Sequence, residues 1–447
     1  MLNTILVFLP LIVLLVLALT TKRMAESMTA ATFLALLILH RENFISGTID
    51  SFYKTLSGSS FQFVLILMVI FGGVIELLQR SGGLMGLGSF VAKYANGKHK
   101  PLVMSWVMSL LMFADEYLNA ITVSLSMSSI TDLNRIPREH LALQVHVSAC
   151  CVCAMVPFTS WIGFTLGMIE DYGMGFMDYV KSLPYMIYPI TIMIICLLLG
   201  LGIFPKIGPL KEAYKRIEEG GPAFIQDKSE RSVVEATDLS DVEERSLWYA
   251  LIPILALIIG VVSFDNDLVH GLVIALIVQF VMYIGGRLMT VEDFFGNFFN
   301  GAKSLTQLTI ILCLGFTLSE TSRELGFFDI VINGVTGAVP SFLIPVIAFL
   351  VTGMCVFTMG GCWIVMLITI PVFVPMAIAA GVSPGLTVAA VMSGVTMGYG
   401  LCIYSDTVFI TSMGTGVSNL KIVKCIMPYA LIAAAVSTIG FIVLALL

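Results

Sequence analysis

The chain carries little charge: only 12% of its 447 residues are Asp, Glu, Lys or Arg, and 5 are histidine. Soluble domains carry about 25% charged residues, so an ordinary water-soluble protein is excluded. The sequence has no GxxxxGK[ST] phosphate loop, which argues against a self-contained ATP-driven pump, and no HExxH motif. The nine cysteines lack the spacing of a metal site or a secreted disulfide framework, and we expect them to be packing residues. We therefore do not expect an enzyme.

What the chain has instead is apolar sequence, at 58% of all residues, in runs that recur from its first residues to its last. This composition predicts an all-α, multi-pass integral membrane protein of the cell inner membrane, with lipid as its surroundings. The net charge of −6 is concentrated in one hydrophilic stretch and gives no reason to expect a nucleic acid as partner. A homodimer is left open.

That hydrophilic stretch divides the chain into two apolar halves of similar length. We expect a first repeat over residues 1–204, a cytoplasmic linker over 205–246 and a second repeat over 247–447. Landmarks match between the halves at a near-constant offset: residues 48–58 with 290–301, 76–83 with 320–327, and 157–163 with 401–407. Such a match predicts an internal structural repeat.

Loop charges indicate that the two repeats have opposite orientations. Arg135 and Arg138 follow an apolar segment whose counterpart in the second half has no basic residue after it, whereas Lys421 and Lys424 occupy a loop whose first-half counterpart is mainly acidic. The positive-inside rule then exchanges the sides of the membrane. We expect about five transmembrane helices and one re-entrant hairpin in each repeat.

The hairpins are expected at 101–130, with "DEYLN" at the tip, and at 341–380, with "TMGGCW" at the tip. About 30 residues that enter and leave by one membrane face fit two half-helices better than one span. The first tip contains Asp115, Glu116 and Asn119. A carboxylate at bilayer depth costs about 2.5–3.5 kcal/mol, so neighbouring acids favour a binding site for a cation or a shared proton. The alternative is a tip that reaches the opposite interface, where the acids are simply solvated.

Each half should also contain a broken helix. Pro157 predicts the first break, beside Thr159 and Ser160, because proline cannot donate its amide. In the second half Gly398 and Gly400 are expected to break the helix before Asp406. Ser405 and Thr407 flank this acid, and hard oxygens of this kind suit sodium, whereas a carboxylate also suits a proton. A polar helix end at the cytoplasmic surface is the alternative interpretation.

Further candidates carry weaker signals. His146 titrates near neutral pH in water, but a histidine bonded to a carbonyl in the core explains it equally well. Aromatic residues close to the breaks and tips either pack on a substrate or serve as ordinary packing residues. These further candidates are His146, Thr358, Trp363, Tyr399 and Tyr404, whereas Trp161 belongs to the main set of expected binding residues, with Thr159 and Ser160. Glu76 with Arg80, and Glu320 with Arg323, are expected to form local ion pairs.

Two runs of sequence resemble a known family. "ADEYLNAITVS", "TDLNRIPREHLAL" and "PFTSW" in the first half, with "SGVTMGYGLCIYSDTVFITSMG" in the second, are similar to the paired signatures of the NhaC-type sodium/proton antiporter family. The likeness covers nearly the whole chain. The positions that match the family signatures are Asp115, Tyr117, Asn119, Pro157, Ser160, Trp161, Ser405, Asp406 and Thr407. The resemblance implies sodium ions or protons as coupling ions, no other cofactor, and a fold of the elevator type.

The chain departs from the family pattern at Glu116, His146, Tyr399 and Tyr404, mostly by replacing carboxylates with aromatic and imidazole groups. The family also includes transporters of organic acids and amino-acid-like solutes, so an organic solute coupled to sodium or protons stays open as the cargo. We expect a secondary active transporter that exchanges a cation and protons at a midplane site, with Asp115 and Asp406 as sodium ligands. A channel is disfavoured because the acids gather at one locus and form no ring along a pore.

Overall fold

The structure is a computed structural model and describes residues 2–21, 24–95, 97–113, 116–224, 242–264, 268–327, 330, 340–403 and 405–447. Two candidate site residues, Asp115 and Tyr404, lie outside these ranges. Every regular element within them is a helix. The all-α prediction is confirmed.

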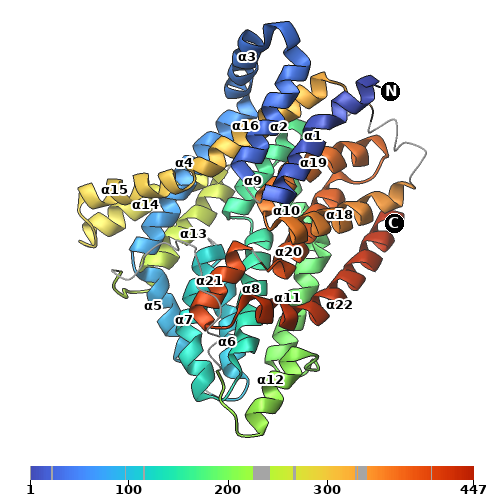
Figure 1. The fold of residues 1–447 in the computed structure, drawn as a ribbon. Coiled ribbons are helices and arrows are strands. Elements are labelled where there is room, and N and C mark those ends of the chain that lie inside the picture. The colour runs from blue at the N-terminus through green and yellow to red at the C-terminus, as the bar shows by residue number, and fades with distance from the viewer. Residues whose placement is uncertain are drawn as a thin grey trace.

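The helices of the first half come before the hydrophilic stretch and are coloured blue to green in Figure 1. They are α1 (Leu2–Thr21), α2 (Met24–His40), α3 (Phe44–Ser57), α4 (Ser59–Arg80), α5 (Gly83–Ala92), α6 (Lys100–Leu111), α7 (Glu116–Leu133), α8 (Arg138–Met155), α9 (Ser160–Ile169), α10 (Phe176–Ser182) and α11 (Ile187–Gly200). Helix α12 (Pro209–Glu218) follows, within the segment that we expected to be a linker.

The second half repeats this order in the part of the chain that the structure describes. Its helices are α13 (Trp248–Ser263), α14 (Leu268–Gly285), α15 (Val291–Ser304), α16 (Thr306–Glu324), α18 (Ile344–Met359), α19 (Cys362–Ala379), α20 (Pro384–Leu401), α21 (Asp406–Thr415) and α22 (Asn419–Leu446). Helices α6 to α9 thus have α18 to α21 as counterparts, and both sets contain a hairpin followed by a broken helix.

The two halves are interleaved. Helix α4 of the first half packs against α14 and α15 of the second, and α16 of the second half packs against α2 and α3 of the first. The expected ion pairs form at these helices: Arg80 Nε lies 2.9 Å from Glu76, and Arg323 lies 3.4 Å from Glu320. Glu320 also binds Lys54 at 2.8 Å, a contact between halves that the sequence did not indicate.

Helices α8 and α20 form the centre of the molecule. Nearly every residue of each is buried, although serine, glycine and threonine make up much of α20. Small residues let α20 approach α18 closely: a Cβ on Gly398 would lie 2.3 Å from the carbonyl oxygen of Gly353. Backbone contact of this kind explains glycine in a helix interior.

This packing corrects one expectation. Gly398 and Gly400 do not break the helix, since α20 continues to Leu401 and the break follows, up to Ser405, with a bend of 45° between α20 and α21. A glycine in an apolar run can either break a helix or allow a second helix to approach closely. Here Gly398 allows the close approach of α18.

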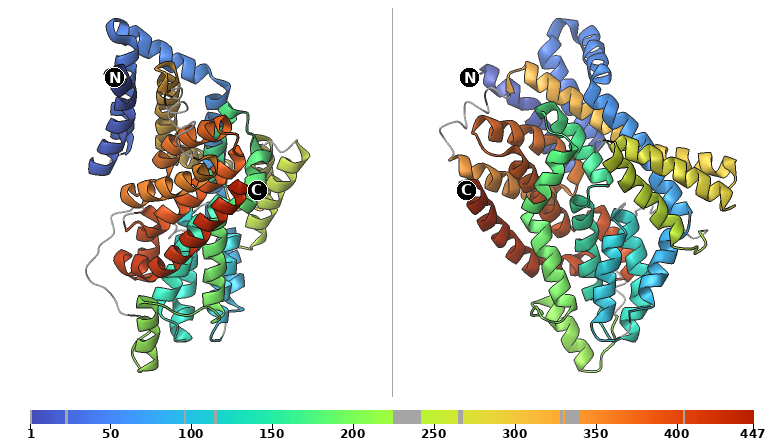
Figure 2. Two further views of the ribbon diagram at one scale, coloured as in Figure 1. Left: turned by 90° about the vertical axis from the view of Figure 1, so that its right-hand side faces the viewer. Right: turned by 180° about the vertical axis from the view of Figure 1, so that it is seen from behind.

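Both hairpins occur where they were expected. Helix α6 ends at Leu111 and α7 begins at Glu116, and α18 and α19 are separated by Gly360 and Gly361. Gly360 has a φ of 75°, which favours glycine. The hairpin α6–α7 lies in the part of the molecule toward α12, and α3 lies at the opposite end from α12 in every view (Figures 1 and 2).

Several helices have the length and composition of membrane spans. Among the described residues, Ser341–Thr358 and Asn419–Leu446 each meet both criteria alone, and three bent helix pairs meet them together. Pro384–Leu401 with Asp406–Thr415 is one of these pairs. The broken helix at the candidate site is therefore apolar enough to cross a bilayer.

Candidate functional site

The tip of the first hairpin begins helix α7. Glu116 is the first residue of α7, is only 2% exposed, and accepts a hydrogen bond from the indole Nε1 of Trp161. Trp161 belongs to α9, beyond the first helix break, so this bond joins the hairpin to the broken helix. Glu116 therefore lies inside the protein. Asp115, the tip acid expected to be a sodium ligand, is outside the described residues.

Asn119 links the two arms of the hairpin. Its Nδ2 donates to the carbonyl oxygen of Ser109 on α6 at 2.7 Å. Its Oδ1 is buried and makes no hydrogen bond among the described residues, as is also true of Ser109 Oγ. An oxygen buried without a partner is costly. The amide oxygen of Asn119 is therefore a buried acceptor without a partner in the described chain.

The first break lies between α8 and α9, as Pro157 predicted. Thr159 uses its hydroxyl locally, donating to the carbonyl oxygen of Cys153 at 2.7 Å. Helix α9 then begins at Ser160. The hydroxyl hydrogen of Thr159 is therefore used in a hydrogen bond across the break.

The second break presents the other acid. Asp406 is the first residue of α21 and is exposed. Tyr117 donates its hydroxyl to Asp406 Oδ2 at 3.1 Å. Ser405 donates to the carbonyl oxygen of Cys402 at 3.2 Å, whereas Thr407 is buried and its Oγ1 makes no hydrogen bond within the described chain. Thr407 is thus the hydroxyl of this pair that stays available.

Aromatic rings pack between the two breaks. The ring centroid of Trp161 lies 5.6 Å from that of Trp363 and 6.1 Å from that of Tyr399. Phe164 lies 4.7 Å from Trp363, edge to face. Trp161 and Tyr399 are fully buried, and the phenolic oxygen of Tyr399 has no hydrogen-bond partner among the described residues. These rings are a buried wall beside Glu116.

Two candidates are placed differently. Thr358 is exposed, and its hydroxyl donates to the carbonyl oxygens of Met354 and Cys355 within its own helix. His146 lies about two turns into α8, and its ring faces the backbone of Tyr399 and Gly400. Neither ring nitrogen of His146 makes a hydrogen bond within the described ranges. His146 therefore packs against the backbone of α20 at Tyr399, and the hydroxyl of Thr358 bonds to carbonyls of its own helix.

Four helix N-termini meet at the site. Glu116 with Trp161 joins the starts of α7 and α9, Trp161 with Trp363 joins α9 to α19, and Tyr117 with Asp406 joins α7 to α21. Each hairpin arm thus packs against the post-break helix of the other half, since α7 contacts α21 and α19 contacts α9. Glu116 and Asp406 lie in first turns, where the helix dipole favours negative charge.

Tyr117 and Phe164 are site residues that sequence reasoning missed. Tyr117 was noted for its match to a family signature, but its bond to Asp406 spans 289 positions of sequence. No local pattern reveals a contact of that length. The only available signal was its place in "DEYLN", beside the acids.

Comparison with known proteins identifies the family. The model of the Na+/H+ antiporter family matches residues 152–446. The chain belongs to this family. It is also 22% identical, over 97% of its length and 89% of the relative's, to a protein of unassigned function from Haemophilus influenzae. The resemblance that the sequence motifs indicated is confirmed.

Two solved transporters share the fold of this antiporter-family chain. The YdaH transporter of Alcanivorax borkumensis superposes with a TM-score of 0.65 at 11% identity, covering 90% of this chain and 88% of that one. MtrF of Neisseria gonorrhoeae, described as one of a class of antimetabolite efflux pumps, superposes at 0.63 and 12% identity, covering 91% and 85%. The chain is a membrane transporter and not an enzyme.

Proposed function

We propose that this transporter exchanges a small cation, sodium, for protons across the cell inner membrane. The observation that carries the proposal is the placement of Glu116 and Asp406, one acid from each half, at the starts of α7 and α21. Two carboxylates at one site can bind either a cation or protons, and this competition couples the two flows. Asn119 Oδ1 and Thr407 Oγ1 add neutral oxygens of the type that sodium prefers.

We infer further that Asp115 contributes to this cation site, since it directly precedes Glu116 in the sequence. Asp115 and Asp406 remain our proposed sodium ligands. The recurring helix order supports two inverted repeats, 1–204 and 247–447, and the fold of hairpins and broken helices supports elevator-type movement of the site across the membrane.

Reconstituted vesicles that contain a pH-sensitive dye test this proposal. A sodium pulse outside wild-type vesicles should move protons, and reversing the gradient should reverse the signal. Asp406→Asn should abolish the exchange, because the amide keeps the size and hydrogen bonding but removes the charge. Asp50→Asn is the matched control, since Asp50 is exposed on α3, away from the site. Unchanged sodium-dependent exchange in Asp406→Asn would refute the proposal.

An organic solute is the second candidate for the cargo. The observation that favours it is the wall formed by Trp161, Trp363 and Tyr399 beside Glu116, because aromatic faces next to carboxylates suit a solute with a positively charged amine. The efflux function in the description of MtrF is consistent with such a cargo. Thermal shift with a panel of amines and amino acids, with and without sodium, decides between the candidates. Stabilisation by sodium alone would refute the second.

A further inference from the structure

Arg138 lies where α8 begins and where α7 and α21 end. It is the first residue of α8, and its guanidinium group binds Asp132 near the end of α7 through both oxygens, with Nη2 2.6 Å from Oδ2 and Nε 3.0 Å from Oδ1. Its Nη1 donates to the carbonyl oxygen of Thr415, the last residue of α21, at 3.0 Å. One side chain thus joins the C-terminal ends of α7 and α21.

These are the two helices that begin with the site acids. Helix α7 runs from Glu116 to its end near Asp132, and α21 runs from Asp406 to Thr415. They lie parallel and in contact, because Tyr117 bonds Asp406 at one end and Ser128 Oγ lies 3.3 Å from the carbonyl oxygen of Gly414 near the other. A slip of one helix along the other would therefore change the distance between the two carboxylates.

The contacts of Arg138 with both helix ends are of the kind that hold α7 in a fixed register against α21. The carbonyls at a helix C-terminus have no partner within the helix and attract cations. Gly416, with a φ of 75°, ends α21 there. The arrangement also fixes two separate acceptors with one planar group, which arginine does better than lysine.

The chain after α12 covers this arginine. The backbone amide of Arg138 donates to the carbonyl oxygen of Ala223 at 3.2 Å, and its guanidinium lies 4.1 Å from the ring centroid of Phe224. Helix α12 itself is held by Arg216, which binds the buried Glu139 at 2.8 and 3.0 Å. These hydrogen bonds raise the pKa of Arg216. The segment that we expected to be a linker thus packs against α8 and covers the contacts of Arg138 with α7 and α21.

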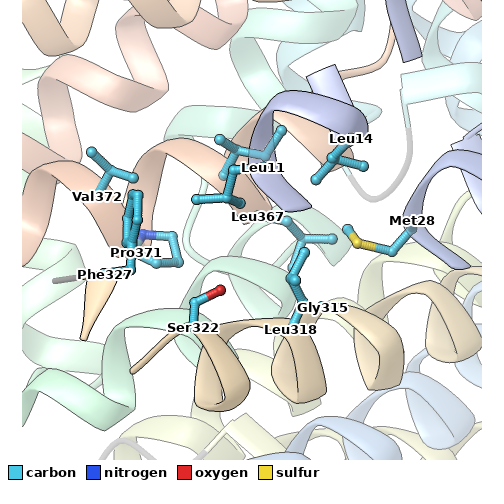
Figure 3. A pocket seen from close by; sticks show the side chains of 11 residues that line it. Leu11, Leu14, Met28, Gly315, Leu318, Ser322, Phe327, Leu367, Pro371 and Val372 are labelled. Carbon is cyan, nitrogen blue, oxygen red and sulfur yellow. The ribbon is translucent and has the colours of Figure 1, made fainter. Parts of the chain in front are cut away.

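The matching helix start in the second half has a different residue. Helix α20 begins with Pro384 where α8 begins with Arg138. The middle of helix α19, the counterpart of α7, borders an apolar pocket that Leu367 and Pro371 line together with Leu11 and Leu318 (Figure 3). The arginine that starts α8 therefore has no counterpart at the start of α20.

We propose that Arg138 is a positioning residue that fixes the register of α7 against α21 and thereby the spacing of Glu116 and Asp406. This inference rests on the proposed cation site. Asp132, which Arg138 binds, lies roughly 24 Å from Glu116 along α7, at 1.5 Å per residue. The charge of Arg138 is therefore screened from the site, and its effect is transmitted through the helices.

Two measurements test the proposal on the full-length protein. The first is hydrogen exchange of α21 by mass spectrometry, where Arg138→Gln should speed exchange at 406–415. The second is the apparent KM for sodium in vesicles, which should rise about tenfold with the maximal rate little changed, since small misplacements of binding groups weaken sites strongly. Arg138→Lys should restore part of both properties, because lysine reaches only one acceptor at a time.

Arg135→Gln is the matched control. Arg135 is exposed and lies in the same turn, and its guanidinium group makes a long contact of 3.5 Å to the carbonyl oxygen of Ile217. Unchanged exchange at 406–415 in Arg138→Gln overturns the proposal, whatever the wild type transports. Faster exchange with an unchanged KM also overturns it, because Arg138 would then be structural only. Wild-type vesicles without sodium/proton exchange refute the proposed function and leave the hydrogen-exchange result to decide whether Arg138 locks the register.

Discussion

Tyr117 and Asp406 form a direct bond between the two halves of the chain, with the phenolic hydroxyl donating to Oδ2 at 3.1 Å. Tyr117 follows Glu116 at the start of α7, and Asp406 starts α21. The hydroxyl of a hairpin residue in one half thus helps to hold the acid of the other half. The bond holds the start of α21 beside the start of α7, the helix that begins with Glu116.

Tyr117→Phe should weaken cation binding without unfolding the protein. The change removes a donor to the ionised carboxylate but keeps the ring, and hydrogen bonds to charged groups contribute about 1.5–3 kcal/mol. Because Asp406 is exposed, the lower value applies, which corresponds to about a tenfold rise in the apparent KM for sodium. Tyr53→Phe on the exposed face of α3 is the control. A KM equal to that of the wild type would show that the bond has no role in binding.

A second prediction compares two glycines of α20. Gly398→Ala should destabilise the protein by about 1–3 kcal/mol through overpacking, since its Cβ would lie 2.3 Å from the backbone oxygen of Gly353. Gly400→Ala meets nothing within 4 Å and should be neutral or stabilising by up to about 1 kcal/mol, because alanine favours helix. Thermal unfolding in detergent measures both. Equal effects of the two changes would contradict the close contact of α18 and α20.

The hairpins and the first break could be predicted because their signals are local. A pair of acids in an apolar run, a Gly-Gly pair and a Pro in a long apolar segment each mark an interruption of a helix within a few residues. The second break was misplaced because Gly398 serves the contact with α18, and a contact with a distant segment leaves no local signal. The pairing of Glu116 with Trp161 was hidden for the same reason.

Helix α12 shows a different limit. Its segment is charged and was interpreted as a linker, yet Leu210, Ala213 and Ile217 are buried at helical spacing. This pattern of one apolar face was present in the sequence. What the sequence did not show is the partner, because the buried Glu139 that binds Arg216 belongs to α8, in the first half.

A third prediction concerns topology. Lys421 binds Glu139 at 2.8 Å and Arg135 contacts Ile217, so both basic residues lie at the end of the molecule that carries α12. We expect this end to face the cytoplasm, and Asp171 and Ser383 to face outside. Single introduced cysteines, labelled from one side with an impermeant maleimide on a background with the native cysteines replaced, measure this. Labelling of Arg135→Cys and Ser383→Cys from the same side would refute inverted repeats.

The last prediction separates two roles of Asn119. Its Nδ2 joins the two arms of the hairpin, and its Oδ1 is the oxygen that we propose binds the cation. Asn119→Ala should destabilise the protein by about 1–3 kcal/mol, because the buried carbonyl of Ser109 loses its donor. It should also reduce the stabilisation that sodium gives in a thermal-shift titration, because a neutral oxygen leaves the site. Asn43→Ala is the control, since Asn43 is exposed and makes no side-chain cap for α3. If the variant is less stable but sodium still stabilises it to the wild-type extent, Asn119 only joins the two arms of the hairpin. The cation would then bind to the carboxylates without Asn119.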